Sequence, residues 1–318
     1  MEILDGNTAP IGFGGKGTSL AWLQQNGYRC PDFDLLDAGN WLAMVGSEDL
    51  TRAWRTVRHG EDQFAFSLAC HELRRAVAES SFPEVIEEWL RSEPFARLGG
   101  VVAVRSSALS EDGASISSAG QYESVLGVTN EEQLRQAVRE VLGSYFGERA
   151  VLYRRARGIE DSTRLAMGVV VQSLVDAEVC GIAFSCHPVT RRPGATIEAS
   201  WGLGPPLVTG ETDPDHFEFD EGGAVSVSIG RKQAELRFDA VAGGVQSGRR
   251  PESDQPCIST ETASEIAATV AEMERRYECP VDVEWAIPSG RPGEVVYLQI
   301  RPVTEAGPPV PVKQLSTY

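Results

Sequence analysis

The sequence lacks any apolar run of 18 or more residues, and its N-terminus, MEILDGNTAP, has neither the basic nor the apolar segment of a secretory signal. We therefore expect no membrane span and no secretion, and a cytoplasmic protein. The chain has 318 residues, of which 42% are hydrophobic and 24% charged. This size and composition predict a globular protein with two domains or with one large domain of two lobes.

The six cysteines form no CxxC pair and are scattered along the chain. In a chain of this length we expect them to be reduced thiols and not a disulfide framework. Cys186 and His187 are adjacent, but neighbours on a strand point to opposite faces, so the two side chains cannot chelate one metal ion together.

Lysine is scarce, because only Lys16, Lys232 and Lys313 occur among 29 basic residues. The net charge of −17 leaves no basic stripe that could bind nucleic acid, so a nucleic-acid partner is not expected. In such an acidic chain a local cluster of positive residues is more indicative of a binding site, and each lysine becomes a candidate for a specific role. Lys232, in IGRKQ, lies outside any expected helix.

The spacing of apolar residues predicts mainly helices in the first half of the chain and mainly strands in the second. The expected helices cover residues 10–27 after a glycine loop, most of 47–98, a segment after a capping box at Thr129–Glu132, and Ser259–Tyr277. The expected strands cover residues 101–104, 168–175, 179–185, 195–204, short pieces of 217–247, and a hairpin of 281–287 with 295–303. This order predicts two α+β lobes that meet at a cleft.

Two segments suit an anionic ligand. GGKG at 14–17 would open a helix with free N–H groups, a positive dipole end and the charge of Lys16, which together favour phosphate. It is not a P-loop, because Pro10 and Gly17 stand where that motif needs glycine and a hydroxyl. Arg105 ends a strand and is followed by the small-residue segment 113–121, whose backbone could cover a polyphosphate. A plain helix-entry turn and a plain surface loop are the alternatives.

The final hairpin offers a third candidate site. Strand alternation predicts that Asp282 and Glu284 share one face, and that Tyr297, Gln299 and Arg301 share the facing side of the partner strand. Carboxylate and amide oxygens are hard ligands that Mg²⁺ accepts together with substrate phosphates. The alternative is a solvated polar face. As a weaker fourth candidate, Gln172 in VVVQSLVD could hydrogen-bond the rim of a purine.

Taken together, the motifs resemble the nucleotide-binding domain of phosphoenolpyruvate synthases, pyruvate phosphate dikinases and rifampicin phosphotransferases. The matching runs are GGKGTSL, VAVRSSALSEDGASISSAGQYESVLGV, GERAVLYR, GVVVQSLV, SWGLGPPLVTGETDPDHF, VDVEWAI and LQIRPVT, in the family order over roughly residues 10–305. The resemblance implies an α+β, ATP-grasp-like fold with ATP and Mg²⁺ between two lobes. We expect an N-terminal lobe of residues 1–174, a C-terminal lobe of 175–305 and a proline-rich tail or linker of 306–318.

The resemblance also implies roles for individual residues. Lys16 and Arg105 match triphosphate ligands, and the Gly120–Gln121 segment matches the loop that covers the phosphates. The remaining matches are Gln172 and Leu174 with the adenine-ribose wall, Glu284 and Gln299 with the Mg²⁺-ATP ligands, and Asp282 and Arg301 with their immediate neighbours. Lys16, Arg105 and Arg301 are the expected catalytic side chains, because they would neutralise charge on the transferred group.

Two positions depart from the family pattern. Pro205 and Pro206 follow GLG where an acid is usual, and His187 precedes a proline where aspartate or asparagine is common. The first change puts cleavage of the β–γ bond of ATP in doubt. Both changes permit a different acceptor or a domain that has lost part of its chemistry.

The family passes its phosphoryl group to a histidine on a separate swivelling domain, but His59, His71, His187 and His216 all lack the glycine-rich context of that carrier. Our leading hypothesis is therefore an ATP-dependent, dikinase-like phosphotransferase component whose acceptor is a histidine carrier on a partner or a missing domain. The alternatives are a stand-alone kinase or ligase that acts on a small metabolite, and a non-catalytic ATP-binding regulatory module.

Overall fold

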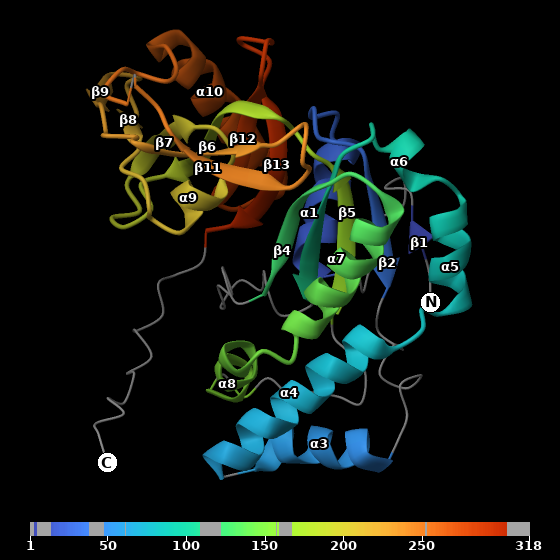
Figure 1. Cartoon of the computed structure of the whole chain (residues 1–318). Helices are drawn as coiled ribbons and strands as arrows, with labels where there is room; N and C mark the ends of the chain where they lie inside the picture. The colour runs from blue at the N-terminus through green and yellow to red at the C-terminus, as the bar shows by residue number, and fades with distance from the viewer. Residues whose placement is uncertain are drawn as a thin grey trace.

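A computed structural model describes residues 3–4, 14–37, 48–60, 62–108, 122–156, 158, 167–251 and 253–303 (Figure 1). Within this part of the chain no helix is both long and apolar enough to cross a membrane. Two β-sheets, each with helices packed against it, form the architecture. The α+β class with two lobes, expected from the sequence, is confirmed.

The first sheet has five strands in the order β1-β2-β5-β3-β4, and each neighbouring pair is antiparallel. Its strands are β1 (Ile3–Leu4), β2 (Phe33–Asp37), β3 (Val102–Ala108), β4 (Ser124–Val128) and β5 (Met167–Ser173). The helices of this lobe are α1 (Gly14–Gln25), α3 (Glu48–His59), α4 (Gln63–Glu79), α5 (Glu84–Arg91), α6 (Pro94–Arg97), α7 (Glu131–Ser144) and α8 (Glu148–Ala156). One apolar core joins α3, α4, α5 and α7 to the sheet.

The second sheet has six antiparallel strands in the order β13-β12-β6-β7-β8-β9. Its strands are β6 (Ala177–Cys186), β7 (Pro193–Trp201), β8 (Asp215–Phe219), β9 (Val225–Ser228), β12 (Val281–Pro288) and β13 (Val296–Pro302). The amphipathic helix α10 (Thr260–Tyr277) covers one face through Ile266, Val270 and Met273. The short helix α9 (Pro205–Val208) and a separate hairpin, β10 (Ala234–Phe238) with β11 (Val245–Arg249), complete the lobe.

Helix α1 connects the two lobes. Leu20 and Ala21 pack against β2 and β5 of the first sheet, whereas Leu23 belongs to the core of the second lobe. The hydroxyl of Ser19 accepts a hydrogen bond of 2.6 Å from the backbone N–H of Ile300 in β13. A helix that is apolar on several sides is a buried helix, and this one holds its N-terminus at the junction between the sheets.

The chain passes from the first sheet to the second between Ser173 and Ala177. Because α1 contributes to both cores, the predicted division into lobes at residue 174 stays a prediction. The predicted tail, 306–318, lies outside the described residues.

Two local predictions need correction. The N-cap of α7 is Asn130 and not Thr129: the Asn130 side chain accepts from the N–H of Gln133, and the Gln133 side chain accepts in return from the N–H of Thr129. The capping box was therefore predicted one residue too early in the chain. Likewise, the glycine loop does not extend to residue 17: GGKG opens the helix as expected, but it is already the first turn of α1, which begins at Gly14.

Candidate functional site

A pocket of about 350 Å³ lies where the two lobes meet. Seven of the predicted site residues line it, and they come from α1, both sheets and the connection between the sheets: Lys16, Arg105, Gln172, Leu174, Glu284, Gln299 and Arg301. These residues are separated by up to 285 positions in the chain, so tertiary folding alone brings them together. Gly120 and Gln121 lie outside the described residues.

The GGKG segment is the first turn of α1 and is fixed to the end of β3. Gly14 has φ +79°, and a Cβ at this position would lie 2.0 Å from the carbonyl oxygen of Ser107, so only glycine fits. The N–H of Gly17 donates to the Ser107 hydroxyl at 2.9 Å. This N–H group is therefore not free for a ligand, contrary to our expectation. The contact instead holds the turn that presents Lys16 to the pocket.

Arg105 and Glu284 form an ion pair that lines the pocket. Arg105 is on β3 and Glu284 on β12, and their charged groups are 3.6 Å apart. Both side chains are mostly buried, with 18% and 20% of their surfaces exposed. Within the described part of the chain, Nε of Arg105 is buried without a hydrogen-bond partner. The pair places a cation and a carboxylate, one from each sheet, at the same point of the pocket.

The β12–β13 hairpin supplies the remaining polar groups of this wall. Glu284 lies directly opposite Gln299 in the strand register, so the two side chains stand side by side on the pocket face. Asp282 lies opposite Arg301, and its Oδ2 atom accepts a hydrogen bond of 2.8 Å from Nε of Arg301 and forms an ion pair of 2.7 Å with Nη2. Asp282 is not among the pocket-lining residues, and it orients the guanidinium of Arg301. Burial raises the pKa of Asp282, while Arg301 opposes this shift.

A β-bulge corrects one detail of this hairpin. The register shifts between Glu284 and Trp285, which pair with Gln299 and Tyr297, so Leu298 is the extra residue. Tyr297 consequently turns into the core of the lobe, and Leu298 lines the pocket. Strict strand alternation predicts the reverse, with Tyr297 on the pocket face beside Gln299 and Leu298 in the core.

The other wall carries Gln172 at the end of β5. Gln172 is 2% exposed, and its Oε1 atom has no hydrogen-bond partner among the described residues. A buried amide oxygen without a partner is unfavourable, so a ligand donor at this point would satisfy it. Around it lies an apolar wall of Leu126, Leu174, Val175, Ala177, Leu203, Ala286 and Leu298. Apart from Leu174, no residue of this wall could be predicted from the sequence, because each of them resembles an ordinary core residue.

His187 is the second position at which this sequence departs from the family pattern, and its contacts explain how the histidine is accommodated. Its Nδ1 atom accepts hydrogen bonds from the N–H groups of Val189 and Thr190, each at 3.1 Å. An aspartate or asparagine oxygen makes the same contacts in such turns. The exchange therefore preserves the turn. Pro205, by contrast, lines the pocket at the first residue of α9.

Lys232 is not part of the pocket. It is fully buried and pairs with the equally buried Asp215, and its ammonium also donates to the carbonyl of Gly230 at 2.9 Å. The other oxygen of Asp215 accepts from the N–H of Cys257 at 2.8 Å. This rare lysine therefore has an internal structural role.

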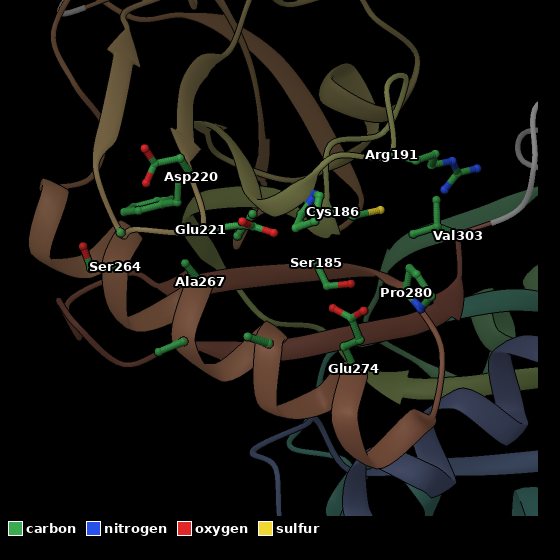
Figure 2. Close-up of a pocket in the computed structure, with 17 residues that line it drawn as sticks. Ser185, Cys186, Arg191, Asp220, Glu221, Ser264, Ala267, Glu274, Pro280 and Val303 are labelled. Atoms are coloured by element: carbon green, nitrogen blue, oxygen red, sulfur yellow. The ribbon is translucent and has the colours of Figure 1, made fainter.

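A larger cavity, of about 790 Å³, lies beside α10 in the second lobe (Figure 2). It contains none of the predicted site residues. Its charged side chains are Arg191 and three acids, Asp220, Glu221 and Glu274. This surplus of acids is unsuited to a polyphosphate, so the smaller pocket between the lobes is the better candidate site.

Comparisons with known proteins agree with the motifs. The family model of the AMP/ATP-binding domain of pyruvate phosphate dikinase matches residues 12–317. A rifampicin phosphotransferase of Streptomyces sviceus is 32% identical over 322 residues, which cover 97% of this chain and 36% of that protein. A probable phosphoenolpyruvate synthase of Methanothermobacter thermautotrophicus is 32% identical over 308 residues, which cover 92% of this chain and 44% of that protein. The chain thus spans less than half the length of these relatives.

Similar solved structures are more distant. The match with the D-alanine-D-alanine ligase of Coxiella burnetii covers 88% of this chain and 45% of the ligase chain, with 10% identity and a TM-score of 0.33. The match with the L-amino acid ligase of Bacillus licheniformis covers 92% of this chain and 43% of the ligase chain, with 13% identity and a TM-score of 0.34. These scores are too low to add to the assignment, which rests on the family model. The resemblance stated from the motifs is confirmed: the chain belongs to the family of the pyruvate phosphate dikinase AMP/ATP-binding domain.

Proposed function

We propose that the chain binds Mg·ATP in the pocket between the lobes and is the nucleotide-binding part of an ATP-dependent phosphotransferase of the dikinase kind. The observation that carries this proposal is the convergence of Lys16, Arg105 and Arg301 with Glu284 and Gln299 in one pocket of a protein with a net charge of −17. Three cations collected against that background suit a polyphosphate.

The two walls suggest which end of the nucleotide lies where. The unpartnered Oε1 of Gln172 can accept a hydrogen bond from the amino group of adenine, and the apolar wall with Leu174 can cover the base. The triphosphate would then extend toward Lys16, Arg105 and Arg301, which would neutralise charge on the group in transfer. Asp282 would act through Arg301, by keeping its guanidinium in place.

The donor set also fits a magnesium ion. Mg²⁺ is usually held by one or two protein oxygens together with substrate phosphates, and the Glu284 carboxylate and Gln299 amide are adjacent in the strand register. In the described part of the chain no cluster of three or more His, Cys, Asp or Glu could hold a metal alone, so phosphate oxygens would complete the coordination. The bound ion would supply charge neutralisation along the triphosphate.

For the acceptor we propose a histidine on a carrier domain or partner protein, or else a small molecule. Transfer would break the P–O bond to the nucleotide and form a P–N bond to the acceptor imidazole. His187 is a poor acceptor, because its Nδ1 accepts from two backbone N–H groups and its Nε2, which then carries the proton, lies 3.7 Å from the Glu218 carboxylate. All six cysteines are free thiols, which fits a cytoplasmic location.

A second candidate is nucleotide binding without turnover. It is favoured by Pro205, which lines the pocket at the position where the family pattern stated from the sequence has an acid. A proline offers neither a carboxylate nor a backbone N–H to a phosphate.

Calorimetry with Mg·ATP and an assay for phosphohistidine, ADP and AMP test both candidates. For the leading proposal we expect binding and transfer to a carrier, with at least about a hundredfold loss of transfer in Lys16→Ala and Glu284→Ala. Glu261→Ala, at an exposed position on α10, is the matched control and should keep full activity. Absence of binding by the wild-type protein would refute the proposal. Binding without transfer to any carrier or metabolite would favour the second candidate.

A further inference from the structure

The β10–β11 hairpin is attached to the second lobe by its middle and its base. The N–H of Leu203 donates to the carbonyl of Leu236 at 2.8 Å. Arg250, just after β11, stacks on the ring of Trp201 at 3.8 Å and forms an ion pair of 2.7 Å with Glu178 on β6. These contacts fix the middle and the base of the hairpin to β6, to the end of β7 and to the residues just after it.

The tip of the same hairpin contacts the first lobe. The N–H of Gly244 donates to the carbonyl of Gly127 on β4 at 2.7 Å. The fit is close, because a Cβ on Gly127 would lie 2.3 Å from the carbonyl oxygen of Gly244. Beside this contact, a Cβ on Gly243 would lie 3.1 Å from the Thr129 hydroxyl, at the start of α7. The hairpin thus spans the two lobes, and Figure 1 shows it as the orange ribbon labelled β11.

The tip is built for this contact by its own sequence. The side chain of Asp239 accepts from the N–H groups of Val241 and Ala242, each at 2.9 Å, and these bonds lower the pKa of Asp239. On the other side, Gly127 has φ +75° and lies where β4 bulges against β3. Both partners of the contact therefore have preset backbone conformations.

The middle of the hairpin reaches the nucleotide pocket. Leu236 packs in the apolar cluster whose other members line the pocket: Leu126 from β4, Leu174 and Val175 from the connection, and Ala177, Leu203, Ala286 and Leu298 from the second lobe. Leu236 itself is not a lining residue, so it supports the wall from behind. A shift of the hairpin would move the walls from both lobes relative to each other.

We infer that the β10–β11 hairpin is a clasp that positions the two walls of the nucleotide pocket, with the Gly127–Gly244 contact as its closure. The inference rests on the proposed function, since the ligand it retains is the nucleotide. Loss of the Gly127–Gly244 contact leaves the polar side chains that bind the nucleotide in place, but it removes this connection between the lobes. Its main effect is a faster release of nucleotide.

Gly127→Ala opens the clasp, because the three atoms nearest to the new methyl group all belong to the backbone of Gly244. Gly244→Ala is the matched control. It has nearly the same φ, +76°, its Cβ would meet nothing within 4 Å, and it keeps the N–H donor. A second variant replaces Asp239–Gly244 by Asn-Gly, a two-residue turn compatible with the Phe238–Val245 pair, and leaves Gly127 unchanged.

Stopped-flow release of a fluorescent ATP analogue, in the presence of Mg²⁺, measures the effect. We expect Gly127→Ala and the shortened hairpin to release it about tenfold faster than the wild-type protein, and Gly244→Ala less than about twofold faster. Equal release from all four proteins would overturn the inference while leaving the proposed function intact.

Hydrogen exchange without nucleotide tests the closure separately. The segment 239–245 should exchange about tenfold more slowly in the wild-type protein than in Gly127→Ala. Equal exchange would refute the clasp. If the wild-type protein binds no nucleotide, the proposed function fails, and this measurement still decides whether the lobes are tied.

Discussion

At the scale of single residues, the most informative groups are polar atoms whose burial needs an explanation. Oε1 of Gln172 is buried and has no partner among the described residues, whereas Lys232 is buried with its charge fully matched by Asp215. An unsatisfied buried group that lines a pocket can be satisfied by a ligand, whereas a buried group with all its partners inside the protein has a structural role. Both residues were singled out in the sequence, but only their surroundings separate the two roles.

Gln172→Leu should weaken ATP binding about tenfold, because it removes the acceptor for the adenine amino group and preserves the volume of the side chain. Titration of the variant with ATP and with inorganic tripolyphosphate separates base recognition from phosphate recognition. The affinity for tripolyphosphate should stay at the wild-type value. An equal loss for both ligands would contradict the position assigned to the base.

Lys232→Ala should lower the free energy of unfolding by about 3–5 kcal/mol, since it leaves the Asp215 carboxylate buried without its cation. Urea denaturation of the two proteins provides the comparison. The paired change Lys232→Met with Asp215→Asn should recover part of the loss, because it removes both charges and keeps one acceptor oxygen near the backbone N–H groups of Gly230 and Cys257. A single variant as stable as the wild-type protein would show that the pair has no structural role.

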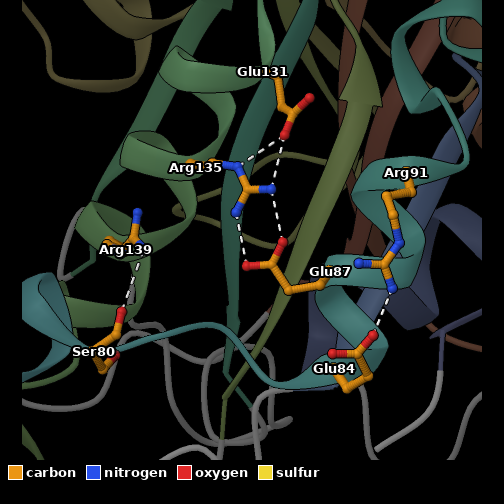
Figure 3. Close-up of polar contacts among 7 residues, drawn as sticks. All are labelled: Ser80, Glu84, Glu87, Arg91, Glu131, Arg135 and Arg139. Atoms are coloured by element: carbon orange, nitrogen blue, oxygen red, sulfur yellow. Dashed lines mark hydrogen bonds and ion pairs between the residues drawn. The ribbon is translucent and has the colours of Figure 1, made fainter.

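At the scale of elements, the polar contacts of α7 and α5 show two kinds of ion pair (Figure 3). Arg135 on α7 makes two hydrogen bonds to Glu87 on α5, at 2.8 and 2.7 Å, and a third of 2.9 Å to Glu131 on its own helix. Arg91 and Glu84 pair on the exposed surface of α5. A half-buried bidentate pair that links two helices should matter more than a solvated pair within one helix.

Arg135→Ala should cost about 1–2 kcal/mol of stability at pH 7, and Arg91→Ala should cause no measurable change. The hydrogen bonds from Arg135 lower the pKa of Glu87 below its ordinary value of 4.5. The contribution of the pair is therefore complete above this value and is lost as the pH falls through the lowered pKa. Urea titrations between pH 3 and pH 7 should show the stabilities of Arg135→Ala and wild type converging toward pH 3. A difference that stays constant with pH would contradict the ion pair as its cause.

At the scale of the whole molecule, the pocket exists only where the lobes meet. Arg105 and Glu284 come from different sheets, α1 contributes to both cores, and the β10–β11 hairpin reaches from one lobe to the other. A ligand held between the lobes must therefore stabilise their native arrangement.

Mg·ATP at a hundred times its dissociation constant should raise the free energy of unfolding by about 2.7 kcal/mol, because only the native state binds it. Thermal denaturation with and without nucleotide measures the gain. The gain should disappear in Glu284→Ala and when EDTA replaces Mg²⁺. Equal gains with and without the metal would contradict the proposed role of Glu284 and Gln299.

The sequence by itself determined many of the helices and strands, the two-lobed α+β class and the family, because apolar spacing, caps and family motifs are local or ordered along the chain. It did not predict β2, β4 or α8, and it ended β3 before Arg105, whereas the strand continues to Ala108. It also placed Glu284 and Gln299 on one face of the final hairpin, since strand alternation is a local property. The same rule failed at the neighbouring residues Tyr297 and Leu298, because a bulge is selected by packing against the rest of the lobe.

Only the tertiary structure decided the rest. It showed that the N–H of Gly17 donates to Ser107, that Nδ1 of His187 accepts from two N–H groups of its own turn, and that Lys232 is internal. It also revealed the apolar wall of the pocket and the contact of Gly127 with Gly244. The physical reason is common to all of these. Each depends on which distant backbone or side chain lies within a few ångströms, and no periodicity along a single chain encodes that proximity.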